Sequence, residues 1–294
     1  MTPTTALTPA ATRRLLAWME AEHRDLPWRR SRDPWAVLVS ELMLQQTQVA
    51  RVVLRWAQFL DRFPTPLACA SSPVAEVIDE WAGLGYNRRA VNLHRCAVVV
   101  VDRHGGALPA DLDALRALPG IGPYTARAVL AFAFERDVAV VDTNVGRVLA
   151  RVGGSPLSPG DAQRAADSWV PAGQGWAWNQ GMLDLGAAVC TKRSPSCGAC
   201  PLRRWCAWHR VGLVAPDPAV GSAAVSAGQS RFEGSDRQGR GRLVDALRAR
   251  SVVRSHDLGL AAGWPDDPDR ARRIADTLVA DGLARWDGVT LTRP

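Results

Sequence analysis

Lysine is almost missing from this 294-residue sequence. Lys192 is the only lysine among 36 basic residues, so the net charge of +7 is carried by arginine. A basic surface suits a polyanionic partner, although richness in arginine is also typical of proteins from GC-rich genomes. Chemistry that needs a lysine amine is limited to the segment around Lys192.

Long apolar runs are missing as well. No stretch approaches the length of a membrane span, and Met1 to Ala11 lacks the basic start and apolar core of a signal peptide. We therefore expect a cytoplasmic protein that has no membrane among its partners.

The alternation of apolar and polar residues that is typical of strands is nearly absent from Thr12 to Arg210. Apolar residues recur there at spacings of three and four, as at Val77, Ile78 and Trp81, and Gly and Pro clusters separate the segments. The pattern predicts an all-α body over residues 1–213.

The composition changes after residue 213. Residues 214–241 are rich in Pro, Ala, Gly and Ser, which predicts a flexible linker. Residues 242–294 regain order and predict a small α+β domain that resembles a winged helix. Its expected elements are helices at 242–250, 255–262 and 268–281, and a hairpin of 283–286 and 289–292 that turns at Asp287-Gly288.

Four cysteines lie close together in the spacing C-x6-C-x2-C-x5-C, at Cys190, Cys197, Cys200 and Cys206. Cysteines this dense in a chain without a secretory signal indicate a metal site. Structural zinc sites usually carry two C-x2-C pairs, and only one is present here. The spacing therefore favours a [4Fe-4S] cluster on the 190–206 loop, with zinc or two local disulfides as the alternatives.

A glycine-rich turn, Leu118 to Ala126, joins two predicted helices, 112–118 and 124–134. Gly120 and Gly122 would let backbone amides point outward beside a helix N-terminus, which is a site for a phosphate oxygen, with help from a monovalent cation. A generic tight turn is the alternative. The pattern is that of a helix-hairpin-helix.

The hairpin, Asp142 and the cysteine loop, in this order, resemble the helix-hairpin-helix DNA glycosylases, in the iron-sulfur branch shared with endonuclease III. Within that branch the sequence resembles the mismatch-specific adenine DNA glycosylases over about residues 11–206. The strings that carry this resemblance are Pro27-Trp28-Arg29, Ser40 to Val49 (SELMLQQTQV), Gly83-Leu84-Gly85-Tyr86 and Val141 to Val145 (VDTNV).

This resemblance implies a two-lobed helical body that holds a [4Fe-4S] cluster. It also implies a monomeric base excision repair enzyme that acts on double-stranded DNA and releases adenine mispaired with 8-oxoguanine or guanine. Many members carry a Nudix-like C-terminal domain that recognises 8-oxoguanine, and residues 242–294 are too few for it. The preference between 8-oxoguanine and guanine therefore stays open.

Two carboxyl groups are the expected catalytic pair. Glu41 lies in an apolar predicted helix, 35–48, where burial favours the protonated acid that adenine needs as a leaving group. A buried ion pair with Arg29 or Arg51 is the alternative. Asp142 precedes a predicted helix as its N-cap and would stabilise an oxocarbenium ion. The resemblance implies that Asn144 supports this pair.

Tyr124 stands where bifunctional relatives such as endonuclease III carry a lysine that forms a Schiff base with the abasic sugar. The resemblance therefore implies a monofunctional enzyme with little strand-cutting activity of its own.

Extruding a base from the duplex leaves a hole that a side chain must fill. The resemblance assigns this wedge role to Gln46 and Tyr86, and an aromatic lid over the core is the alternative for Tyr86. The family often has a second aromatic where this chain has Asn87. Arg88 and Arg89 either contact phosphates or lie on a solvated helix face.

Arg24, Trp28 and Gln180 stand at positions that approach the extruded adenine in the family. Ordinary core packing is the alternative for Trp28, and an exposed helix position is the alternative for Gln180.

Two other functions stay open on the residues alone. One is a thymine glycosylase that acts on G·T mismatches, which also accommodates Tyr124. The other is a noncatalytic iron-sulfur DNA-binding or redox-sensing regulator, which the winged-helix-like segment favours. Glu41 together with Gln45-Gln46-Thr47 favours adenine, and the pair of Glu41 and Asp142 favours an enzyme.

Overall fold

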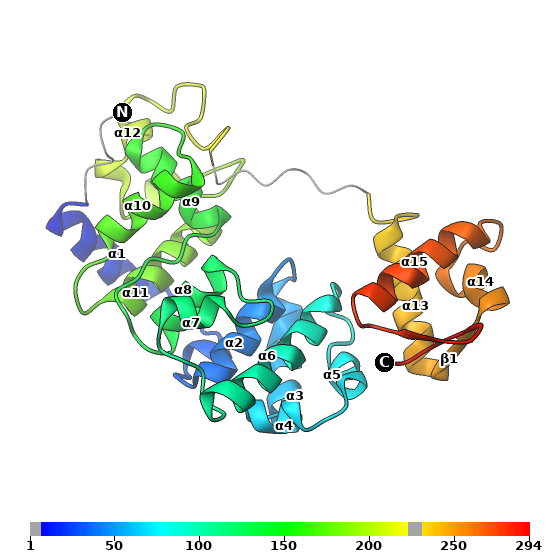
Figure 1. Cartoon of the computed structure of the whole chain (residues 1–294). Helices are drawn as coiled ribbons and strands as arrows, with labels where there is room; N and C mark the ends of the chain where they lie inside the picture. Colours follow the sequence, from blue (N-terminus) through cyan, green and yellow to red (C-terminus); the bar gives the residue numbers. More distant parts are fainter. Residues whose placement is uncertain (1–6, 223–230) are drawn as a thin grey trace. The chain divides into compact units, whose positions relative to one another are not determined.

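The computed structural model describes residues 7–222 and 231–294 (Figure 1). The chain divides into two compact units, each built from separate segments. The first unit comprises residues 1–37, 110–116 and 121–227, and the second comprises residues 38–109, 117–120 and 228–294. Among the described residues, no helix is long and apolar enough to cross a membrane.

The first unit is entirely helical. Its elements are α1 (Pro9–Glu22), η1 (Pro27–Arg29), α7 (Leu112–Arg116), α8 (Pro123–Phe132), α9 (Thr143–Gly153), α10 (Pro159–Trp169), α11 (Gly175–Asp184), η2 (Leu185–Val189), η3 (Cys197–Ala199), η4 (Arg203–Trp205) and α12 (Ala207–Arg210). Helix α2 (Pro34–Leu44) begins in this unit and ends in the second. The predicted all-α body is confirmed.

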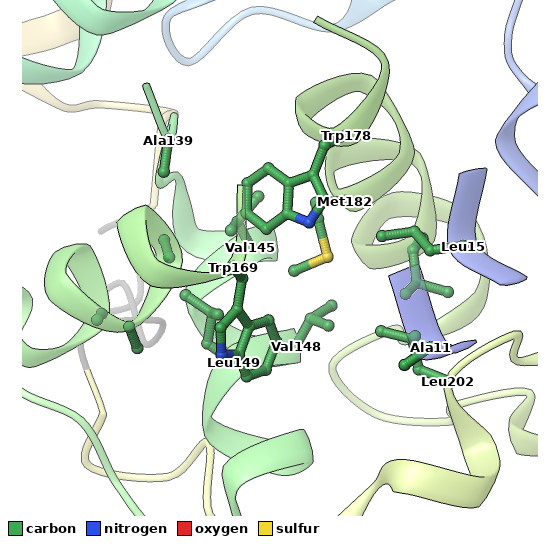
Figure 2. Close-up of a cluster of buried hydrophobic side chains, with 14 of the residues drawn as sticks. Ala11, Leu15, Ala139, Val145, Val148, Leu149, Trp169, Trp178, Met182 and Leu202 are labelled. Carbon is green, nitrogen blue, oxygen red and sulfur yellow. The ribbon is translucent and has the colours of Figure 1, made fainter. Parts of the chain in front are cut away.

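The core of the first unit gathers around Trp169 and Trp178. Leu15 from α1, Val148 from α9 and Met182 from α11 pack in the same cluster (Figure 2). Because α1 and α11 are far apart in sequence but packed together, the N-terminal segment is part of this core.

The second unit contains α3 (Val49–Arg62), α4 (Pro66–Ala70), α5 (Val74–Glu80) and α6 (Arg88–His104). Its core holds three fully buried aromatic rings. The Phe59 centroid lies 5.0 Å from that of Phe63 and 6.0 Å from that of Trp81. These offset and edge-on contacts fix α3 against the end of α5.

The C-terminal part of the second unit has the element order of a winged helix. It consists of α13 (Asp236–Arg250), β1 (Val252–Arg254), η5 (Ser255–Asp257), α14 (Leu258–Ala262), α15 (Pro268–Ala280), β2 (Arg285–Asp287) and β3 (Thr290–Thr292). The predicted hairpin is confirmed, because β2 pairs antiparallel with β3. We refer to residues 231–294 as the C-terminal domain.

Two features differ from the expectation for this region. Helix α13 begins at Asp236, inside the predicted linker, because the polar residues Asp236 to Arg240 continue the helix whose apolar face starts at Leu243. Strand β1 was not predicted, since three residues are too short for a period-two pattern. It pairs with β3, so the sheet order is β1-β3-β2.

Part of the predicted linker packs on the first unit. Asp217 forms an ion pair of 2.7 Å with Arg151, and the Ser222 hydroxyl donates to the Leu157 carbonyl at 3.2 Å. Residues 223–230, the rest of the Ser- and Ala-rich stretch, lie outside the described residues. The division of the chain at 213 and 242 stays a prediction.

Candidate functional site

Asp142 is the N-cap of α9, as predicted. Its Oδ1 accepts hydrogen bonds from the backbone N–H groups of Asn144 at 2.9 Å and Val145 at 2.7 Å. Its Oδ2 accepts from the Asn144 side-chain amide at 2.9 Å. Three donors therefore fix both oxygens of this half-buried carboxylate at the positive end of a helix.

A buried arginine extends this arrangement to the cysteine loop. Arg147, which is 7% exposed, donates through Nη2 to the Asn144 side-chain oxygen at 2.8 Å. It donates through Nε to the Cys190 carbonyl at 2.7 Å. One guanidinium thus connects the backbone of a predicted cluster ligand with the residue that orients Asp142.

Glu41 lies on α2 and is 6% exposed, as the apolar pattern predicts. The neighbouring helix positions Ala36 to Met43 are buried as well. Arg29, a predicted alternative partner, makes a bidentate pair with Asp184, at 2.7 and 2.8 Å. Arg51 is exposed. Glu41 is therefore a buried carboxyl on a largely apolar helix.

Arg24, Trp28 and Gln180 belong to the first unit. Arg24 donates through Nε to Asp184 at 2.6 Å, and Gln180 lies one turn before Asp184 on α11. Trp28 is 7% exposed and Gln180 is 4% exposed, so Gln180 does not occupy the exposed helix position considered as an alternative. Helix α11 therefore brings Arg24 and Gln180 to one region of the unit.

Asp184 is the charged centre of that region. Burial raises the pKa of its carboxyl, but the hydrogen bonds and charges of Arg29 and Arg24 outweigh burial and lower it. Asp184 thus stays ionised and holds Arg24 in place. No pattern in the sequence indicates the role of Asp184, because its partners Arg24 and Arg29 lie about 160 residues away.

The predicted hairpin lies between α7 and α8. Gly120 has a φ of +77°, and a Cβ at this position would lie 2.7 Å from the Asn92 Cβ, so both conformation and space require glycine. Gly122 is the N-cap of α8 and Pro123 is its first residue. Tyr124 follows in the first turn, half-buried, as predicted.

Both predicted wedge residues have strained backbones. Gln46 has a φ of +56° and Tyr86 a φ of +48°, conformations that cost a residue with a side chain about 1–2 kcal/mol. Gln46 follows α2 and Tyr86 precedes α6. Tyr86 is 41% exposed, which disfavours the alternative of a lid over the core.

One buried arginine holds both wedge turns. Arg89, which is 8% exposed, donates to the carbonyls of Leu42 at 2.6 Å and Gln45 at 2.6 Å in the first turn. It also donates to the carbonyls of Leu84 at 3.2 Å and Gly85 at 2.8 Å in the second. Burial lowers the pKa of Arg89 to about 10, so the side chain is cationic at neutral pH.

This role of Arg89 was missed at the sequence level, where a phosphate contact or a solvated helix face was expected. Its neighbour Arg88 does match an exposed position and pairs with Asp281 at 3.3 Å. No pattern in the sequence indicates the carbonyls that Arg89 binds, because every residue has a carbonyl group.

The four clustered cysteines line one cavity together with Val148, Arg151, Leu185, Arg203 and Trp208. None of the six cysteines forms a disulfide. The Arg151 guanidinium donates to the Cys190 Sγ at 3.3 Å, and the Cys206 Sγ donates to the Arg151 carbonyl at 3.3 Å. Burial raises the pKa of Cys200 to about 12, so this thiol ionises only where a cation compensates.

The described residues contain no group of three or more His, Cys, Asp and Glu side chains placed for a single metal ion. The four cysteines nevertheless share one cavity.

The predicted residues fall on both units. The first unit holds Asp142, Asn144, Tyr124, Gly122, Arg24, Trp28, Gln180 and the four cysteines, and the second holds Glu41, Gln46, Tyr86, Arg88 and Gly120. Within the first unit, Asp142, Asn144 and the cysteine loop are joined by hydrogen bonds. Within the second, Arg89 joins the turns of Gln46 and Tyr86.

Several known proteins are similar to this chain. Residues 39–172 match the family of HhH-GPD superfamily base excision DNA repair proteins. An adenine DNA glycosylase of Mycobacterium tuberculosis is 43% identical over 279 residues, which cover 92% of this chain and 88% of that protein.

Two solved structures share the fold. A thermostable thymine-DNA glycosylase has a TM-score of 0.64 and 29% identity, over 68% of this chain and 95% of the other. Endonuclease III trapped with DNA has a TM-score of 0.61 and 25% identity, over 69% of this chain and 96% of the other.

Proposed function

The chain belongs to the adenine DNA glycosylases of the HhH-GPD superfamily, and from this we propose that it hydrolyses the N-glycosidic bond of adenine mispaired with 8-oxoguanine or guanine. Its partner is DNA. The identity of 43% over 92% of the chain carries the proposal. We further propose a monomer that works on double-stranded DNA in the cytoplasm, at the nucleoid.

The proposed chemistry divides between two carboxyl groups. Glu41, buried on α2, donates a proton to N7 of adenine and makes the base a leaving group. The carboxylate that remains then activates water. Asp142 stabilises the positive charge that develops on the sugar, and Asn144 keeps its carboxylate in one orientation through the bond of 2.9 Å.

The proposed binding steps use the two turns that Arg89 holds. Tyr86 and Gln46 fill the space that the extruded adenine leaves, and Arg24, Trp28 and Gln180 face the base. Gly120 and Gly122 present backbone amides to a phosphate, with a monovalent cation beside them. Tyr86 is exposed and has a strained backbone, which supports an inserting role.

We propose that Cys190, Cys197, Cys200 and Cys206 hold a [4Fe-4S] cluster. Their spacing and the shared cavity support this ligand set. When bound, the cluster supplies a rigid anionic centre that orders the basic loop. The chain's own Arg151 and Arg147 contact Cys190 and so tie that loop to α9.

Single-turnover assays test the function directly. Duplexes that carry A opposite 8-oxoguanine, A opposite G, or T opposite G are incubated with excess enzyme, and released bases are separated by chromatography. We expect adenine from the first two duplexes and no thymine from the third. Thymine release alone would establish a thymine glycosylase, and release of no base would favour a noncatalytic regulator.

Because a tyrosine stands at position 124, we predict that the abasic strand is cut only after treatment with alkali. A phenol cannot form the Schiff base through which a lysine amine cuts the abasic strand. We expect the reacted duplex to stay intact on a denaturing gel until it is heated with hydroxide, and borohydride to trap little enzyme on the product. Trapping as efficient as that of endonuclease III run alongside would contradict the monofunctional assignment.

A further inference from the structure

The C-terminal domain contacts three consecutive residues in the rest of the second unit, and the first of them is the predicted wedge residue Tyr86. Each of the three receives a different side chain. The contacts are Arg237 Nη1 to the Tyr86 hydroxyl at 3.2 Å, Arg248 Nη2 to Asn87 Oδ1 at 3.4 Å, and Arg88 Nη1 to Asp281 Oδ1 at 3.3 Å. Contacts from the C-terminal domain therefore fix residues 86–88, in addition to the hydrogen bonds of Arg89.

Further contacts anchor the domain on α5. Arg248 donates to the Ile78 carbonyl at 2.7 Å, and its side chain is only 16% exposed. Arg293, near the end of the chain, pairs with Asp79 and donates to the Ala75 carbonyl at 3.2 Å. Two arginines of the domain thus contact one short helix, at two of its backbone carbonyls and at the Asp79 carboxylate.

The turn after α15 lies directly against α6. Gly282 has a φ of +75°, and a Cβ there would lie 2.8 Å from the Arg95 guanidinium and 3.3 Å from Val91. The neighbouring Asp281 pairs with Arg88 on α6 and with Arg240 of its own domain, at 3.3 and 2.5 Å. The turn after α15 and helix α6 are therefore in close contact, and the Asp281 carboxylate links Arg88 on α6 with Arg240 of the C-terminal domain.

The usual DNA-reading surface of a winged helix is poorly suited to DNA in this domain. The second helix of the helix-turn-helix pair, α15, normally enters the major groove with its N-terminal residues. Here Asp266, Asp267 and Asp269 lie at that end. Arg272 is stacked 3.9 Å above the Trp286 ring and pairs with Asp276. The three aspartates offset the charges of Arg270, Arg272 and Arg273, so this end of α15 has no net positive charge to attract phosphates.

We propose that the C-terminal domain acts as a support for the wedge, in which Arg237 is a positioning residue for Tyr86. This inference rests on the proposed function of Tyr86. Holding residues 86–88 before DNA arrives lowers the ordering cost of insertion. The Tyr86 ring stays 41% exposed while its hydroxyl is bound, so the wedge is fixed without being covered.

A double-mutant cycle in the full chain tests this support. Arg237→Ala removes the donor, Tyr86→Phe removes the hydroxyl that accepts from it and keeps the ring, and the third variant carries both changes. Base extrusion is followed by the fluorescence of 2-aminopurine placed opposite 8-oxoguanine. We expect each single change to slow extrusion about tenfold, as for the loss of one charge-assisted hydrogen bond, and the double change to slow it no further.

Arg250→Ala is the matched control, because it removes the same charge from the same helix at an exposed position. It is expected to leave extrusion unchanged. An equal slowing by Arg250→Ala would show a general effect of charge and overturn the proposal. Faster extrusion by Arg237→Ala would show that the domain blocks the wedge, which overturns it as well.

Hydrogen exchange without DNA separates this inference from the proposed function. Amides of residues 83–90 are expected to exchange faster in Asp281→Ala and Arg237→Ala than in the wild type and in Arg250→Ala. Unchanged exchange would overturn the support even if the enzyme releases adenine. If the wild type releases no adenine but exchange changes as expected, the docking stands and the glycosylase proposal fails.

Discussion

Glu41→Gln is expected to abolish adenine release while the mispaired duplex still binds. The amide has almost the same shape as the acid, so packing on α2 is kept, but it has no acidic proton to give to the base. General acid catalysis contributes about 10²- to 10⁴-fold, and Glu41 is proposed to serve both as acid and in activating water, so we expect a loss near the upper end. Single-turnover rates and binding by gel shift measure the two effects separately.

Two variants make this result specific. Glu41→Asp keeps a carboxyl group on a side chain that is shorter by one methylene. This variant should retain more activity than Glu41→Gln. Glu135→Gln removes an exposed carboxyl that pairs with Arg32, and it should leave the rate unchanged. A Glu41→Gln rate within tenfold of the wild type would remove Glu41 from the proposed mechanism.

Arg89→Leu is expected to destabilise the fold and to disorder both wedge turns. The guanidinium donates to carbonyls at the end of α2 and in the Gly83 to Tyr86 loop, and leucine would remove all of these donors. The Thr47 hydroxyl would be left as a donor to the Gln45 and Leu84 carbonyls alone. Loss of a buried, multiply bonded charge costs about 3–5 kcal/mol. Urea unfolding followed by circular dichroism measures the free energy of unfolding.

Arg88→Leu is the matched control at the next position. Its side chain is 64% exposed and has one ion-pair partner, so we expect a loss of stability below about 1 kcal/mol. Arg89→Lys keeps the positive charge but lacks the planar guanidinium group. Its loss of stability should lie between those of Arg88→Leu and Arg89→Leu. Equal stability of Arg88→Leu and Arg89→Leu would contradict the assignment of Arg89 as the residue that holds the turns.

The features that the sequence predicted well are local ones. Asp142 could be identified as an N-cap because the cap, the backbone N–H groups that donate to it and the start of the helix lie within four residues. The Asp287-Gly288 turn likewise identified the C-terminal hairpin. Burial of Glu41 followed from the apolar residues of its own helix. Each of these features depends on neighbours along the chain.

The features that were missed depend on distant partners. Arg89 acts on carbonyls more than 40 residues away, and Asp184 acts on Arg24 and Arg29 across about 160 residues. Carbonyl acceptors leave no mark in the sequence, because every residue has one. The same holds for Arg237, whose partner Tyr86 is 151 residues away. The sequence contains many arginines, and it does not distinguish buried ones such as Arg89 from exposed ones.

The packing of α1 on α11 determines when this protein can fold during its synthesis. Glu22 ends α1 and Gly175 begins α11, and the chain between them takes roughly 8–30 s to make at 5–20 residues per second. During that time the apolar face of α1, with Ala11 and Leu15, has left the ribosome without its partner. The N-terminal helix is therefore among the first segments to be made, but it can be buried only after α11 has been made.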